Sequence, residues 1–279
     1  MIVISRDLVL APPATPADVN ADNPLIGWQN IVSVDTVSAT QEDPDFPVAN
    51  LATPSTAPRQ SWRGVDLDTF TIELTIETTD LLDYVALAGH NLAGRTVTVE
   101  GTIGDEVGSP PEQEWFELVQ ETMLISNEPM LFRFVPQSLS GLRLVVSAGL
   151  TVPRIAVMYA GALLVLQRRI YVGHQPGPLN RKTDRSVGVS EKGNFLGRVI
   201  RSQSTATAIE QRNLTPEWYR ETFEPFAKFA DQNPFFWAWR PGSYPREVGF
   251  VWTAGDISPA NEQPNGMMGV SIDVEGIFE

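Results

Sequence analysis

The sequence predicts a mainly β protein, in which a jelly-roll β-sandwich is joined to a smaller β-barrel or sandwich domain with one packed helix. Three observations lead to this fold class. Short segments alternate apolar and polar residues with the period of two that a half-buried strand requires. Turns containing Gly and Pro separate these segments. Only one segment, near residues 216–230, has the spacing of an amphipathic helix.

We expect three parts, with boundaries at residues 1–27, 28–162 and 163–279. The first combines an apolar start with a Pro-rich linker, and we expect residues 1–20 to pair as a strand with the C-terminal domain, which would make the sandwich an insertion. Within the sandwich, FTIELTI (70–76) alternates cleanly, whereas YVALAG (84–89) is nearly all apolar and suits a strand covered on both faces. An acidic loop spans 104–114. Further strands are expected at 95–101, 130–136, 142–149 and 154–161.

The C-terminal domain opens with one or two strands in 162–173, and a loop follows them. Residues 195–211 form a long extended or hairpin-like segment. Thr215 is placed to cap the helix and Pro216 to occupy its first position. Pro225 should kink or split the helix. The remaining strands are expected at 234–245, which is rich in aromatic residues, at 248–252 and at 269–276.

Charge divides the chain unevenly. The net charge is −14, and residues 1–165 hold 7 Lys/Arg against 21 Asp/Glu, whereas residues 166–279 hold 13 of each. A basic stretch lies within 168–201, and from it we take Arg168, Arg169, Arg198 and Arg201 as a candidate oligomer interface. The acidic remainder of the chain would repel phosphate, which argues against nucleic acid as a partner.

The sequence lacks the residue types and motifs that usually identify an enzyme site. The chain has no Cys and only two His, and it lacks Walker A, H-E-x-x-H and G-x-S-x-G motifs. We therefore predict no catalytic residue, no metal site and no cofactor; abundant carboxylates are the only support for a glycan hydrolase. The N-terminal stretch does not predict a signal peptide, and the longest apolar run is too short for a bilayer. We expect a protein made in the cytoplasm without membrane insertion.

His90, in YVALAGHNLAG, is the residue that best separates an enzyme from a binding protein. Gly89 and Asn91 on either side favour a turn at the end of a strand, because both tolerate left-handed backbone. The alternative is a ligand contact on an exposed loop. Together with Trp62 and Arg63, residues His90 and Asn91 form the candidate ligand-contact loop.

Two resemblances extend these expectations. The stretch from PVANLATPSTAPRQSWRG to RTVTVEG, with LRLVVSAG and RIAVMYAG later, resembles discoidin-like, galactose-binding-type jelly rolls over residues 28–162. The Gly-His-Asn-Leu turn resembles the version carried by bacteriophage tail proteins. GVSEKGNFLGR, LTPEWYRETFEPF, PFFWAWRPGSYPREVGFVW and MMGVSIDVEG resemble distal tail and baseplate proteins of long-tailed phages over 166–279.

These resemblances imply a structural virion protein that forms a homo-oligomeric ring, a hexamer, at the distal end of a phage tail. Its partners would be the tail tube, hub, tip or fibre proteins, and its location the virion. The alternative is a carbohydrate-binding protein that recognises host surface glycans. A glycan hydrolase is the third hypothesis.

Overall fold

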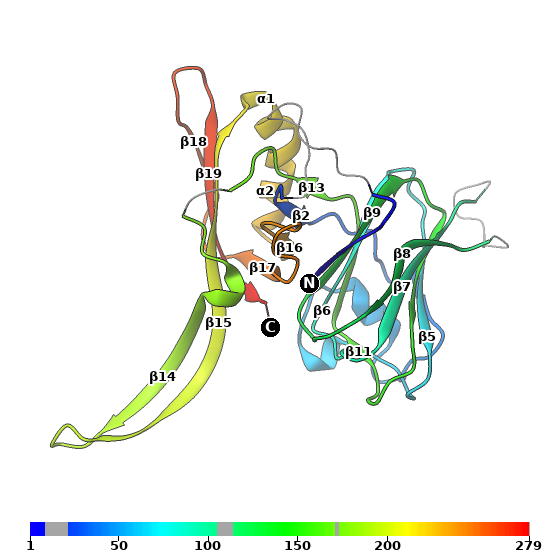
Figure 1. The fold of residues 1–279 in the computed structure, drawn as a ribbon, viewed down its shortest axis with the longest axis horizontal. Helices are drawn as coiled ribbons and strands as arrows, with labels where there is room; N and C mark the ends of the chain where they lie inside the picture. Colours follow the sequence, from blue (N-terminus) through cyan, green and yellow to red (C-terminus); the bar gives the residue numbers. More distant parts are fainter. Residues whose placement is uncertain (9–21, 105–113, 171–172, 279) are drawn as a thin grey trace.

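The computed structural model describes residues 1–8, 22–104, 114–170 and 173–278, with side chains at all of these except 202 and 203. Most of the predicted Pro-rich linker and acidic loop lie outside the described residues. The fold is mainly β, as predicted: a two-sheet sandwich packs beside a second, open sheet that carries one helical segment (Figure 1). Within the described ranges, no helix combines the length and the apolarity that crossing a membrane requires.

The sandwich has an inner sheet of strand order β1-β9-β6-β12 and an outer sheet of order β3-β5-β10-β7-β8. The inner strands are β1 (Ile2–Ile4), β6 (Leu82–Ala88), β9 (Met130–Gln137) and β12 (Val157–Gly161). The outer strands are β3 (Val37–Ala39), β5 (Phe70–Thr75), β7 (Thr96–Thr102), β8 (Phe116–Met123) and β10 (Gly141–Val146). A short ladder of β4 (Trp62–Arg63) and β11 (Arg154–Ile155) closes one end, near the 3₁₀ helices η1 (Val48–Ala52) and η2 (Pro58–Gln60).

Strand β6 is buried along its whole length, as its apolar sequence predicts. Val85 and Leu87 on one face belong to the core between the two sandwich sheets. Tyr84, Ala86 and Ala88 on the other face pack in a separate cluster with aromatic residues of the C-terminal sheet. The inner sheet is therefore covered on both faces, and the two domains share an apolar interface.

The C-terminal sheet runs in the order β13-β2-β16-β17-β19-β15-β14, with β18 also pairing with β19. Its strands are β2 (Leu25–Gly27), β13 (Leu164–Val165), β14 (Arg181–Val189), β15 (Phe195–Leu214), β16 (Phe235–Ala238), β17 (Val248–Thr253), β18 (Ser258–Asn261) and β19 (Met268–Ile277). A 3₁₀ helix, η3 (Gly177–Leu179), precedes β14. Trp237 on β16 is buried, whereas Trp252 on β17 is 41% exposed.

The helical segment is divided into α1 (Pro216–Trp218), a π-helical turn η4 (Tyr219–Phe223) and α2 (Glu224–Ala230). The irregular turn ends two residues before Pro225, whose ring and missing N–H disturb the preceding turn. Thr215 is the N-cap residue and Pro216 begins the helix, as predicted. The Thr215 side chain makes no capping bond, however; its hydroxyl accepts a hydrogen bond from the Gln167 side chain.

The N-terminal segment pairs differently from our expectation for residues 1–20. Strand β1 runs parallel to β9 in the sandwich, whereas β2 lies between β13 and β16 of the C-terminal sheet. Residues 1–27 thus contribute to both domains, and the pairing with the C-terminal sheet comes from residues 25–27.

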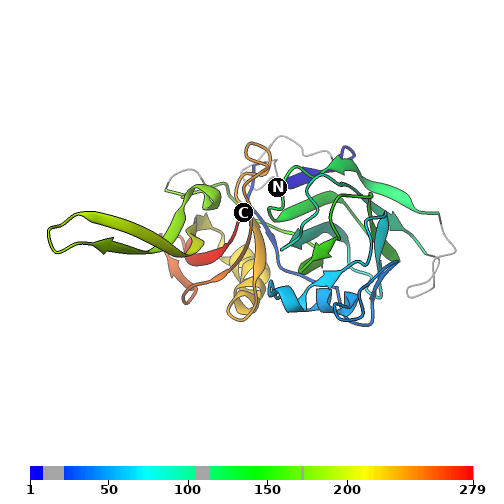
Figure 2. The same cartoon turned by 90° about the horizontal axis from the view of Figure 1, so that it is seen from below.

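A two-stranded β-hairpin projects from the C-terminal sheet, away from the sandwich (Figures 1 and 2). We call residues 181–204 the arm. In this part of β15 the partner is β14 alone, because β19 pairs with β15 only from Thr205 onward. The hairpin-like segment predicted for 195–211 is one strand of it, and the other strand, β14, falls partly where we expected a loop.

Candidate functional site

The candidate ligand-contact loop gathers at the sandwich end around the β4–β11 ladder, but most of its side chains have structural roles. Trp62 is fully buried, its ring lies tilted against that of Phe70 with 4.9 Å between the centroids, and its indole N–H donates to the Gln41 carbonyl. It belongs to the sandwich core. Trp62 therefore cannot stack on an external ligand.

His90 is also internal, with 3% of its surface exposed. Its Nε2 lies 3.0 Å from the Glu128 carbonyl, and the Leu92 backbone N–H lies 3.4 Å from its Nδ1. Burial lowers the pKa of His90 to about 4. Gly89 precedes it with φ of +64°, where an added Cβ would come within 2.8 Å of the Ala156 side chain. The favoured prediction of a turn agrees with this geometry.

Asn91 fastens the turn to the next loop. Its side-chain amide donates to the Val152 carbonyl at 2.8 Å and its Oδ1 accepts from the Arg154 N–H at 2.7 Å. These two hydrogen bonds connect the turn to residues 152–154, where β11 begins beside β4. The sequence predicted Asn91 as a local turn residue, but its partners lie 61 and 63 residues away.

Two half-buried arginines, Arg63 and Arg154, lie in the ladder at this end. Arg63 and Arg154 are directly opposite across the β4–β11 ladder, and residues in that relation project from the same face. The guanidinium of Arg63 lies 3.7 Å above the Phe46 ring. The Nε of each arginine is buried without a hydrogen-bond partner among the described residues. Arg154 was not a sequence candidate, because its position opposite Arg63 depends on the ladder.

The arm is the second candidate site. Its apolar side chains are among the most exposed of the described residues: Phe195 is 67%, Leu196 70% and Val199 67% exposed. A two-stranded hairpin with no covered face gains little from burial and is marginal by itself in water. Exposed apolar side chains gathered on such an element make the arm a candidate contact surface.

The four arginines of the predicted interface do not come together. Arg198 and Arg201 lie exposed on the arm, whereas Arg168 is half-buried and donates to the Asn213 carbonyl at 2.6 Å. Residues 198 and 213 are separated by 15 positions of β15, roughly 50 Å of extended chain. Arg169 is half-buried beside Arg168. The two pairs would contact different surfaces.

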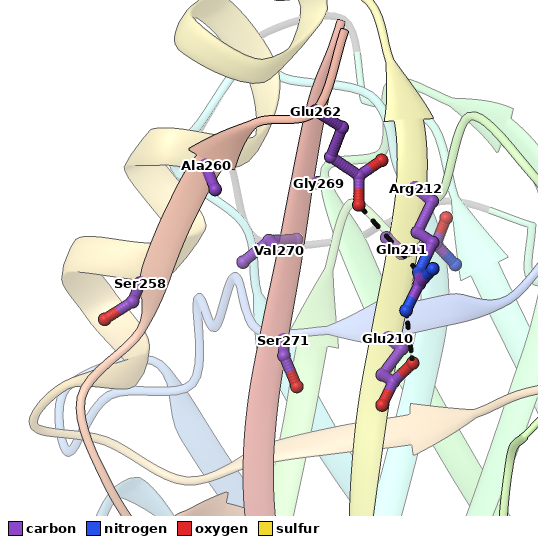
Figure 3. A pocket seen from close by; sticks show the side chains of 9 residues that line it. All are labelled: Glu210, Gln211, Arg212, Ser258, Ala260, Glu262, Gly269, Val270 and Ser271. Atoms are coloured by element: carbon purple, nitrogen blue, oxygen red, sulfur yellow. Dashed lines mark ion pairs between the residues drawn. The ribbon is translucent and has the colours of Figure 1, made fainter.

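A shallow cavity of about 210 Å³ lies on the outer face of the strands β15, β19 and β18 (Figure 3). Its charged groups are paired with one another: the Arg212 guanidinium lies 3.6 Å from a Glu210 oxygen and 3.8 Å from a Glu262 oxygen. Gly269 leaves the space that the Glu262 carboxylate occupies. These pairings account for the polar lining without a ligand.

The buried ionisable groups serve packing. Asp83 accepts the Leu163 N–H at 2.7 Å, where the sandwich leads into the C-terminal domain, and burial raises its pKa to about 6. Arg133 lies close enough to lower that pKa. In the described ranges no three His, Asp or Glu side chains are placed to hold a metal ion.

Comparison with known proteins gives similarity in structure alone. No family model matches the sequence, and no curated protein matches it. Similar solved structures include the chitosan-binding module 1 of a chitosanase/glucanase from Paenibacillus sp. IK-5, with 14% identity, 48% of this chain, 99% of that chain and a TM-score of 0.41.

Two further structures are similar over half of this chain. One is the family 32 CBM from C. perfringens NanJ in complex with galactose, with 14% identity, 50% of this chain, 99% of that chain and a TM-score of 0.38. The other is a Ruminococcus gnavus GH29 fucosidase in complex with fucose, with 16% identity, 50% of this chain, 28% of that chain and a TM-score of 0.40. Similarity at this level assigns no function, and none of the three is a tail protein.

Proposed function

We propose that this protein is a structural assembly subunit that associates with copies of itself through the arm. The observation that carries the proposal is the arm itself: a hairpin exposed on both faces, with Phe195, Leu196 and Val199 in solvent. Such a surface is stabilised when it packs on another chain. An arm on one side of the subunit, meeting a different surface on the next, gives a heterologous contact, and heterologous contacts build rings or filaments.

The ring of a phage distal tail or baseplate is the specific assembly that the sequence resemblance implies. A closed hexamer in the virion, in contact with tail tube, hub, tip or fibre proteins, is part of this proposal. The acidic surface fits a protein partner better than nucleic acid. The resemblance and the arm support the proposal; the structural comparisons do not bear on it.

Electron microscopy of the purified full chain, with mass measured by light scattering, tests the proposal. We expect closed rings for the wild type. A variant in which a short turn replaces residues 185–201 should have the mass of one subunit. A full chain that remains monomeric at micromolar concentration would overturn it.

Glycan binding by the sandwich is the second candidate, and Arg63 with Arg154 is the observation that favours it. The two arginines are directly opposite on one face, and neither forms an ion pair with a described residue. Like charges in direct opposition repel, and a ligand with oxygen acceptors would relieve that repulsion. Carbohydrate ligands are also named for the similar modules from Paenibacillus and C. perfringens.

Glycan-array binding of the full chain tests this candidate. Arg63→Ala and Arg154→Ala should each reduce a glycan signal at least tenfold, whereas Arg59→Ala, an exposed arginine outside the ladder, should leave it unchanged. No binding on the array, and none to free sugar at millimolar concentration, would exclude the candidate.

A further inference from the structure

We propose that the arm of one subunit docks on the outer sheet face of the sandwich in the next copy. The inference rests on the proposed self-association and specifies the surface that receives the arm. It is carried by the side chains on one face of the arm, by those on the outer sheet and by the opposite positions of the two surfaces in the subunit.

One face of the arm combines cationic and apolar groups. In the ladder, Arg185 is opposite Ile200, Val187 is opposite Arg198 and Val189 is opposite Phe195. Directly opposed residues project from the same side of a hairpin. We call these six residues the cationic face. All six side chains are exposed, so the face can contact a partner surface that is both acidic and partly apolar.

The outer sheet of the sandwich offers that chemistry. Glu73, Arg143, Glu100 and Glu117 form a row across β5, β10, β7 and β8, and we call this row, with the exposed Glu121 and Met123 of β8, the acidic face. Arg143 is paired with Glu100 at 2.5 Å. No described residue forms an ion pair with Glu73 or Glu117, so two carboxylates of the row are available to a cation.

The rest of the fold leaves this face uncovered. The inner sheet of the sandwich packs against the C-terminal sheet through Tyr84, Tyr159 and Phe236. Among the described residues, no second layer packs over the outer sheet (Figure 1). It is thus the sheet of the sandwich that a second chain can reach.

Geometry makes the contact intermolecular. The arm points away from its own sandwich, and the strands β5, β7 and β8 lie on the far side of the molecule from it (Figures 1 and 2). An arm can therefore meet only the acidic face of another copy. Complementary charge also selects this orientation over arm-to-arm contact, because two cationic faces repel.

Reciprocal charge reversal tests the pairing. The variants are Arg185→Glu/Arg198→Glu on the arm and Glu73→Lys/Glu117→Lys on the sheet, each checked for an unchanged circular dichroism spectrum. Sedimentation velocity should show each variant alone as a monomer. An equimolar mixture should recover assembly, because every arm then meets a sheet of opposite charge.

Two controls keep the result specific. Glu77→Lys/Asp80→Lys makes the same charge change at exposed positions outside the acidic face, and Arg185→Lys/Arg198→Lys conserves the arm charge; both should assemble like wild type. If wild type assembles and the Glu73→Lys/Glu117→Lys variant still does, or the mixture stays monomeric, the docking surface is elsewhere and the inference is overturned. If wild type itself is monomeric, the proposed function fails with it.

Discussion

His90 Nε2 donates to the Glu128 carbonyl over 3.0 Å, which fixes the imidazole in one neutral tautomer. A carbonyl oxygen only accepts, so the proton must sit on Nε2, and Nδ1 is left to face the Leu92 N–H at 3.4 Å. Protonation would place a second N–H against that donor. A residue that first suggested chemistry is held neutral between two loops of the sandwich.

Stability should therefore depend on pH through His90. Its pKa falls from 6.5 to about 4 in the folded chain, so the unfolded chain binds the proton first as pH falls. Neutral, buried His90 therefore supports the full free energy of unfolding above pH 6.5. As pH falls from 6.5 to 4, the free energy of unfolding drops by a total on the order of 3 kcal/mol. Urea unfolding at pH 7.5 and 4.5 should show a larger loss for wild type than for His90→Gln.

Asp83 changes the free energy of unfolding with pH in the opposite direction to His90. Its raised pKa, about 6, has the opposite sign: the folded chain binds its proton first, so stability rises as pH falls from 6 toward 4. Asp83 is present in both proteins, and the difference between them isolates His90. Equal pH slopes for wild type and His90→Gln would contradict the assignment.

Trp62 should act on stability. It is fully buried, so Trp62→Ala should lower the free energy of unfolding by about 3–5 kcal/mol. Trp252→Ala removes the same side chain from a position that is 41% exposed, and should cost less, because part of that ring is already in water in the folded chain. Equal losses in denaturant titrations would show that the Trp62 ring is not in the core.

Phe236 should couple the two domains. Its ring lies 5.5 Å from that of Tyr159 on the sandwich and 5.0 Å from that of Phe250 on the neighbouring strand. Phe236→Ala removes the centre of this interface, at a cost of about 3–5 kcal/mol. We expect one calorimetric unfolding transition in wild type and two in the variant. A single transition in the variant, shifted only in temperature, would argue against separable domains.

The strands with one buried face were predictable from sequence, because burial of one face is what creates a period of two. FTIELTI became β5 and GVSIDVEG became most of β19. Strand β14 was missed in part for the same reason: both of its faces are exposed, so no alternation distinguishes RKTDRSVGV from a loop. Strand β1 pairs with β9 about 130 residues away, and no local pattern encodes that choice.

The candidate sites were predictable only in part. Sequence located the loop around His90 and Asn91, but not that Trp62 is internal, since an aromatic residue beside a turn is equally suited to packing and to stacking. Arg154 became a candidate through its ladder with Arg63. The interface predicted from the basic stretch stays a prediction: Arg168 donates to the Asn213 carbonyl, and only part of the stretch lies on the arm.

Sedimentation equilibrium of the full chain beside a Phe195→Ser/Leu196→Ser/Val199→Ser variant is the most direct test of the central claim. The three side chains are exposed, so the variant should fold with wild-type stability to within about 0.5 kcal/mol. We predict an assembled wild type and a monomeric variant at the same micromolar concentration. Equal masses for the two proteins would contradict assembly through the arm.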